Sequence, residues 1–143
     1  MSKSRVTRRF AATAGAVSLL AAYTAAAQSP QPQATIYPVS FPINSVELHT
    51  ADQETVHGVA AMMERNTALV ATVLGKADTL GSPEYNEKLS QRRAQAVFEA
   101  LVYKYNVPAS RVELRWTGER LPTVPTGDQA AELQNRVVDI ILR

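Results

Sequence analysis

One arginine stands among apolar residues, where a charged side chain needs a partner. Arg93 follows Leu89 by four residues and precedes Val97 by four, so the three side chains share one face of a predicted helix. An unpaired buried charge costs about 3–5 kcal/mol. The nearest candidate anion is Asp78, just after a predicted buried strand. Ligand sites of α/β sheets favour that edge. A guanidinium grips a carboxylate and an aspartate accepts from an ammonium, so the pair suits a zwitterionic ligand.

The same residues also fit a structural role, in which Asp78 and Arg93 form a salt bridge that ties a loop to the helix. Asn86, on the first helical turn, can add an amide that points to the same place. Arg136, near the start of the last strand, is ambiguous in the same way. Periodicity alone leaves both interpretations open.

The elements that position these residues follow from hydrophobic spacing and breaker residues. Strands are predicted where apolar or alternating runs occur, and helices where apolar residues recur every three or four positions. The predicted strands are 35–41, 68–74, 111–117 and 137–142, and the predicted helices are 50–66, 83–105 and a short one at 128–133. This order, βαβαβ(α)β, predicts an α/β (α+β) two-layer sandwich with the helices on one face of a sheet.

Local signals mark several of these boundaries. Ser82 followed by Pro83 is a good helix start, with an N-cap hydroxyl and proline in the first turn. Thr50 and Gln53 fit a capping box for the first helix. Pro38 inside the first strand predicts an edge position, because proline cannot donate to a sheet ladder.

The N-terminal segment is typical of an export signal. It combines four basic residues within the first nine positions, an Ala-rich apolar run from Phe10 to Ala22, and small residues at Ala25 to Ala27. We therefore expect a signal peptide at 1–27, a flexible leader at 28–34 and one domain at 35–143. An uncleaved anchor is the alternative, and Arg8 with Arg9 leaves Sec and twin-arginine export open. The expected location is the periplasm, on the cell-wall side of the outer membrane.

Charge and composition exclude several function classes. The whole chain carries +2, but four of its 15 basic residues lie in the predicted signal, which leaves 11 against 13 acidic residues and a charge of −2. A nucleic-acid partner is therefore not expected, nor is a membrane span after the signal. The absence of cysteine excludes disulfides and a lipoprotein anchor. His49 and His57 lack ligand-type neighbours, and no nucleophile pattern occurs, so we expect no enzyme, cofactor or metal.

The motifs around Asp78 and Arg93 resemble the OmpA-like peptidoglycan-binding domain. The most specific stretches are Gly75-Lys76-Ala77-Asp78, Gly81-Ser82, Tyr85-Asn86, Leu89-Ser90, Arg93-Ala94 and Asn135-Arg136-Val137-Val138. The resemblance also includes Phe41 to Leu48, Val97, Leu101, Val107 to Val112, Gly118-Glu119 and Pro122, and so extends over nearly all of the predicted domain. The resemblance implies a mixed four-stranded sheet and noncovalent binding of peptidoglycan. In the family, the aspartate and arginine aligned with Asp78 and Arg93 hold the diaminopimelate of the stem peptide.

The resemblance thus implies a peptidoglycan site made of Asp78, Arg93, Asn86, Arg136, Ala77 and Leu89. Lys76 replaces the family's usual histidine, Ala77 its threonine and Val137 its second arginine, which removes up to two polar contacts. Lys76 can restore some of the positive electrostatic potential that the site loses because Val137 replaces the arginine. The departures leave a second function open, an interaction module of an envelope complex that has weakened or lost wall binding. An envelope protein or a second copy of the chain is then the expected partner.

Overall fold

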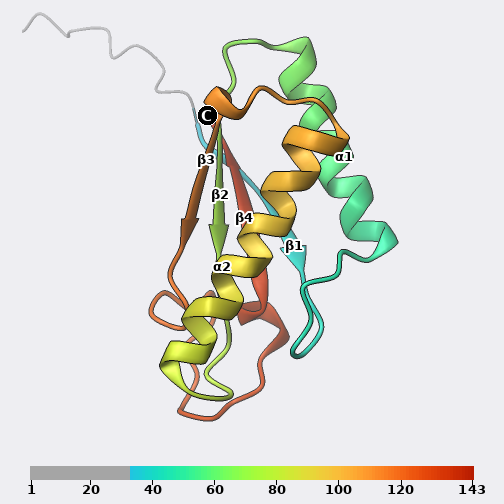
Figure 1. The fold of residues 1–143 in the computed structure, drawn as a ribbon. Helices are drawn as coiled ribbons and strands as arrows, with labels where there is room; N and C mark the ends of the chain where they lie inside the picture. Colours follow the sequence, from blue (N-terminus) through green and yellow to red (C-terminus); the bar gives the residue numbers. More distant parts are fainter. Residues whose placement is uncertain (1–32) are drawn as a thin grey trace, which may run out of the picture.

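The computed structural model describes residues 33–143, so the predicted signal and most of the predicted leader lie outside the described residues. Four strands form one sheet in the order β1-β4-β2-β3, and two long helices pack on one of its faces (Figure 1). The main elements are β1 (Thr35–Ser40), α1 (Thr50–Arg65), β2 (Ala71–Gly75), α2 (Pro83–Glu99), β3 (Val112–Trp116) and β4 (Val137–Leu142). The predicted two-layer fold is confirmed.

The sheet is mixed. β4 lies between β1 and β2 and is antiparallel to both, whereas β2 and β3 are parallel. A direct connection between parallel neighbours requires a crossover, which α2 supplies. The edges of the sheet are β1 and β3, and Pro38 lies in β1, as predicted for an edge strand.

The core lies between the sheet and the helices. Alternate residues of each strand point into it, among them Val39, Val73 and Ile140, because successive side chains of a strand point to opposite faces. α1 contributes Val56, Val59, Ala60 and Met63, the residues of its apolar stripe. The remaining side chains of each strand lie on the opposite face of the sheet. The segment after β3 contacts this face through the hydrogen bond between Lys76 and Thr123.

Gly75 sets how closely α2 approaches the sheet. A Cβ atom at this position would lie 2.1 Å from the backbone oxygen of Ser90, so only glycine fits. α2 begins as predicted, because the Ser82 hydroxyl accepts a hydrogen bond from the backbone N–H of Tyr85 at 3.2 Å. It continues as one turn of π-helix, η1 (Ala100–Lys104).

Two local predictions were wrong. α1 has His49 as its N-cap with no side-chain bond, and Gln53 donates instead to the Leu48 carbonyl at 3.0 Å. The helix predicted at 128–133 is absent, and a 3-10 turn, η3 (Leu133–Asn135), follows that region. The Thr79 hydroxyl donates to the Gly127 carbonyl at 2.6 Å and accepts from Ala130 N–H at 3.0 Å. Gln129, which lies between the two bonded residues, has φ +54°, a left-handed conformation that a right-handed helix does not contain.

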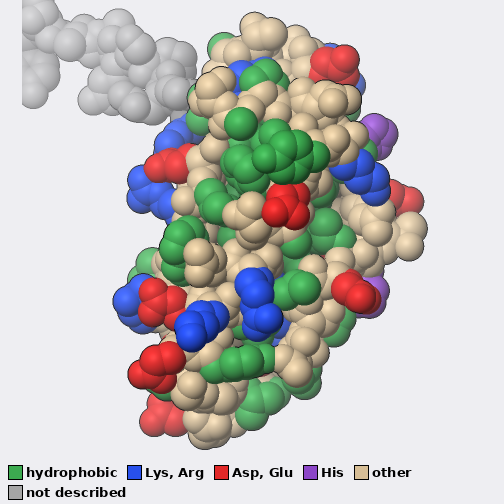
Figure 2. Space-filling model, viewed as in Figure 1, with side chains coloured by type: hydrophobic (Ala, Val, Ile, Leu, Met, Phe, Trp, Pro, Cys, Tyr) green, Lys and Arg blue, Asp and Glu red, His purple; other side chains and the backbone are tan. Residues whose placement is uncertain are grey.

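Among the described residues, no helix is both long and apolar enough to cross a membrane. On the helix-bearing face, basic and acidic side chains are interspersed, without a continuous basic surface (Figure 2).

Candidate functional site

A pocket of about 370 Å³ lies beyond the C-terminal end of β2, beside the start of α2. Four of the six predicted site residues line it: Asp78, Leu89, Arg93 and Arg136. Its wall is completed by residues from three loops and from the first turn of α2: Ile43, Asn44, Leu80, Gly81, Gln129 and, in α2, Tyr85. We refer to it as the strand-end pocket. Its location agrees with the preference of α/β sheets for ligands at strand carboxyl ends.

Arg93 is fully buried, and its contacts explain why an apolar helix face carries a cation. Its Nε donates to the Ser45 carbonyl at 2.9 Å and its Nη2 to the Pro42 carbonyl at 2.8 Å. The guanidinium also lies 5.4 Å from the centre of the Phe41 ring, within the range of a cation–π contact. Arg93 therefore fastens the segment between β1 and α1 to α2.

One donor of Arg93 has no partner in the part of the chain that the structure describes. Nη1 is buried and makes no hydrogen bond within residues 33–143. The pKa of the Arg93 guanidinium is lowered to about 10: burial is the largest cause, nearby Asp78 acts in the opposite direction, and Arg136 acts in the same direction as burial. An anion beside Arg93 would relieve this penalty, because it favours the charged form.

Asp78 is paired with Arg136 rather than with Arg93. Its Oδ2 lies 3.0 Å from Arg136 Nη1, and both side chains are almost buried. The same oxygen accepts a longer bond from the backbone N–H of Glu132, at 3.3 Å. Among residues 33–143 there is no salt bridge between Asp78 and Arg93, so the direct structural pair considered from the sequence is not formed.

Asn86 and Ala77 are close to the strand-end pocket but do not line it. The Asn86 amide nitrogen donates to Glu119 Oε2 at 2.7 Å, and its buried Oδ1 has no partner in the described residues. Ala77 is buried, and its backbone N–H bonds the Gly118 carbonyl at 2.9 Å. Ala77 therefore joins the β2–α2 connection, and Asn86 the first turn of α2, to the loop that follows β3.

Lys76 does not add positive charge to the strand-end pocket. Its Nζ lies 2.7 Å from Asp139 Oδ2 and 3.2 Å from the Thr123 hydroxyl, away from the residues that line the pocket. The suggestion that Lys76 restores positive potential at the site was therefore wrong. The Lys76–Asp139 pair instead holds the loop after β3 against β4.

Sequence reasoning missed Gln129, which organises the pocket from a distant loop. Its side chain bridges Gly81 in both directions: Nε2 donates to the Gly81 carbonyl at 2.8 Å, and Oε1 accepts from the Gly81 N–H at 3.2 Å. Gly81 has φ +103°, a left-handed conformation that suits glycine. No periodicity marks Gln129, because its role depends on a contact 48 residues away in sequence.

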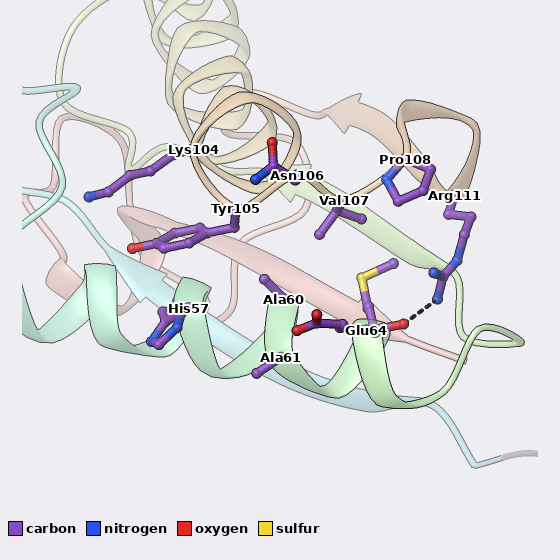
Figure 3. A pocket seen from close by; sticks show the side chains of 11 residues that line it. His57, Ala60, Ala61, Glu64, Lys104, Tyr105, Asn106, Val107, Pro108 and Arg111 are labelled. Carbon is purple, nitrogen blue, oxygen red and sulfur yellow. Dashed lines mark hydrogen bonds between the residues drawn. The ribbon is translucent and has the colours of Figure 1, made fainter.

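A second hollow, of about 500 Å³, lies between α1 and the segment 104–111 that follows α2 (Figure 3). His57 stacks on Tyr105 at 5.1 Å, and Lys104 donates to Gln53 Oε1 at 2.9 Å. Arg111 donates to the carbonyls of residues 63, 66 and 69, so it closes the end of α1. The basic side chains of this hollow thus have partners, whereas Arg93 retains a buried free donor.

Comparison with known proteins places this geometry in a family. Residues 40–136 match the sequence model of the OmpA family. The chain belongs to the OmpA family. It is 38% identical over 92 residues to outer membrane protein 41 of Porphyromonas gingivalis, covering 63% of this chain and 22% of that protein. It is 33% identical over 104 residues to the probable lipoprotein YiaD of Escherichia coli, covering 73% of this chain and 47% of that protein. The OmpA-family chain therefore spans less than half the length of these curated relatives.

Solved structures agree with the family assignment. The crystal structure of the peptidoglycan-associated lipoprotein from Burkholderia pseudomallei has a TM-score of 0.68 at 27% identity, covering 74% of this OmpA-family chain and 89% of that one. The C-terminal domain of Helicobacter pylori MotB shares the fold with a TM-score of 0.66 at 18% identity, covering 75% and 84% of the two chains.

Proposed function

We propose that this protein binds peptidoglycan noncovalently by holding the diaminopimelate of the stem peptide in the strand-end pocket. The observation that carries the proposal is the buried, unpartnered Nη1 of Arg93 at a pocket that also contains Asp78 and Arg136. Family membership and the similarity to a peptidoglycan-associated lipoprotein support the same class of ligand. The role is binding rather than catalysis.

The chemistry of the pocket matches the ligand at both charges. The side-chain end of diaminopimelate carries an ammonium beside a carboxylate. The carboxylate can accept from the free donor of Arg93, and the ammonium can donate to Asp78, whose second oxygen makes no bond within residues 33–143. The ion pair with Arg136 holds Asp78 in place. A pocket of about 370 Å³ suits one amino-acid side chain rather than a glycan strand.

The proposed setting is the periplasm, with residues 1–27 as a signal peptide, 28–34 as a leader and 35–143 as the binding domain. The composition of the first 27 residues supports export, and the outer membrane proteins among the relatives support an envelope location.

Cosedimentation with purified diaminopimelate-type sacculi tests the proposal. We expect the wild type to sediment, and we expect Asp78→Asn and Arg93→Lys to lose at least about tenfold in affinity, since each alters a buried charged contact. Arg92→Gln and Asp128→Asn are matched controls, because both side chains are exposed. Circular dichroism of each variant separates lost binding from lost folding.

Competition identifies the ligand group. Free diaminopimelate should release the protein from sacculi, whereas Nα-acetyl-lysine, whose side chain ends in an ammonium with no carboxylate beside it, should not. If acetyl-lysine competes equally well, Arg93 does not bind a ligand carboxylate, and the assignment of diaminopimelate to the strand-end pocket is wrong. If the folded wild type stays in the supernatant, wall binding itself is refuted.

One observation favours the second function, an interaction module of an envelope complex. Asp78 already has an ionic partner in Arg136, and Ala77 offers no hydroxyl. A wild type that fails to sediment but retains its fold would support that function.

A further inference from the structure

The two edges of the sheet differ in whether another strand can join them. At β1, the outward side is closed: Pro38 has no N–H, and the Ser40 N–H is bonded to Asp52 Oδ1 at 3.0 Å. Such devices block edge-to-edge pairing. β3 forms the opposite edge and pairs only with β2 among the described strands (Figure 1).

The backbone of β3 presents free groups at this edge. The Thr117 N–H donates inward to the Gly75 carbonyl at 3.0 Å, and backbone groups alternate between the two sides of a strand. The groups of Glu113 and Arg115 therefore point toward β2, and those of Val112, Leu114 and Trp116 point outward. The Val112 N–H bonds the Ala109 carbonyl, which leaves the Val112 carbonyl and both groups of Leu114 and Trp116.

The side chains of β3 are arranged symmetrically in charge about Leu114. Glu113 and Arg115 flank it and lie on the face of the sheet opposite the helices. Within one copy the Glu113 carboxylate accepts hydrogen bonds from Arg115, Thr72 and Arg143, so an ion pair with a second copy replaces the contact that Arg115 makes within its own chain. In an antiparallel pair of two β3 strands centred on Leu114, each Glu113 lies opposite the Arg115 of the other copy, at Cβ distances of about 4.5–5.5 Å. Centring on Arg115 or on Glu113 places like charges opposite each other, and so does parallel pairing.

We propose that a second copy of this chain docks on β3, antiparallel and centred on Leu114, to form a continuous eight-stranded sheet. Two Leu114 N–H groups donate to the opposite Leu114 carbonyls, and each Trp116 N–H donates to the Val112 carbonyl of the other copy. The free backbone groups and the charges thus select the same register.

The helix layer is compatible with this arrangement. α2 packs on β2 and β3, so the α2 of a second copy lies about two strand spacings away, or about 10 Å. Helices in contact have axes about 8–10 Å apart. None of the residues that line the strand-end pocket belongs to β3, so the dimer leaves both pockets open, at opposite ends of the sheet. This inference does not depend on wall binding.

Charge exchange tests the proposal on the full-length chain, expressed with its own N-terminal segment. By sedimentation equilibrium, the wild type should dimerise. Glu113→Arg and Arg115→Glu should each raise the dimer dissociation constant at least tenfold, because each places like charges opposite each other. A mixture of the two variants should form a heterodimer, since one copy then presents two arginines to the two glutamates of the other. The double exchange should restore the homodimer.

Trp116, the single tryptophan of the chain, gives a second readout. Its emission should shift to shorter wavelength with rising wild-type concentration but not in the single variants. Arg120→Glu is the control, because Arg120 is exposed on the loop after β3. A wild type that stays monomeric up to about 1 mM overturns the proposal. So does a dimer that the two β3 exchanges leave unchanged, because its interface must then lie elsewhere.

Discussion

Replacing Arg93 with methionine tests whether a buried cation stabilises this fold. Methionine approximates the aliphatic part of the arginine side chain but removes the charge and both hydrogen bonds. The two bonds, to the carbonyls of Pro42 and Ser45, are charge-assisted and contribute about 1.5–3 kcal/mol each. Their combined loss is about 3–6 kcal/mol.

The opposing effect is the relief of charge burial. The lowering of the Arg93 pKa from its ordinary value to about 10 corresponds to about 3 kcal/mol of unfavourable free energy for the buried charged form. The difference between the two effects is about 0–3 kcal/mol, so we expect Arg93→Met to lower the free energy of unfolding by about 1.5 kcal/mol. Arg93→Lys should be at least as unstable, because an ammonium cannot reproduce the planar fork and is still buried.

Urea denaturation followed by circular dichroism measures the difference. Arg92→Met is the matched control: this neighbour is exposed on the same helix, so its effect should stay within about 0.5 kcal/mol. If Arg93→Met is more stable than the wild type, the two carbonyl bonds do not offset charge burial. In that case Arg93 does not stabilise the fold, and the energetic argument given above is wrong.

Three further predictions concern stability. Gly75→Ala should destabilise the protein by at least about 3 kcal/mol, because its Cβ would lie 2.1 Å from a backbone oxygen. Gly58→Ala, at an exposed position of α1, should instead stabilise it by about 0.5–1 kcal/mol, and urea denaturation should show the two effects with opposite signs. Arg111→Lys should cost about 2–4 kcal/mol, since one ammonium cannot serve the carbonyls that end α1, and an unchanged thermal midpoint would contradict this role. Hydrogen bonds from Arg115 and Thr72 lower the pKa of Glu113 below 4.5. The wild type should therefore be more stable than Glu113→Gln above about pH 5 and should lose that advantage as the pH falls through the lowered pKa. A stability difference that does not change between about pH 2 and pH 7 would contradict this prediction.

Local sequence patterns predicted some features of the site but not others. Arg93 stands out because its position within an apolar stripe is a local property of a helix, and the Ser82-Pro83 start fixes where that helix begins. The partner of Asp78 is not a local property. Arg136 is 58 residues away in sequence, and its side chain reaches Asp78 because β4 inserts between β1 and β2.

The same distinction explains the wrong predictions. Residues 128–133 have an acceptable local helix pattern, but Thr79, about 50 residues earlier, bonds the backbone there and holds it in turns. Lys76 was considered a source of charge at the site, yet the alternation of side chains along the chain turns it toward Asp139.

The sequence by itself determined the four strands, the two long helices and the isolated cation, because each depends on residues within a few positions of one another, and the order of these elements indicated the sandwich. Only the tertiary structure decided which carbonyls Arg93 holds, which cation pairs with Asp78, and which edge of the sheet stays open. These depend on side-chain directions and on elements brought together across the sheet, which spacing along the chain does not specify.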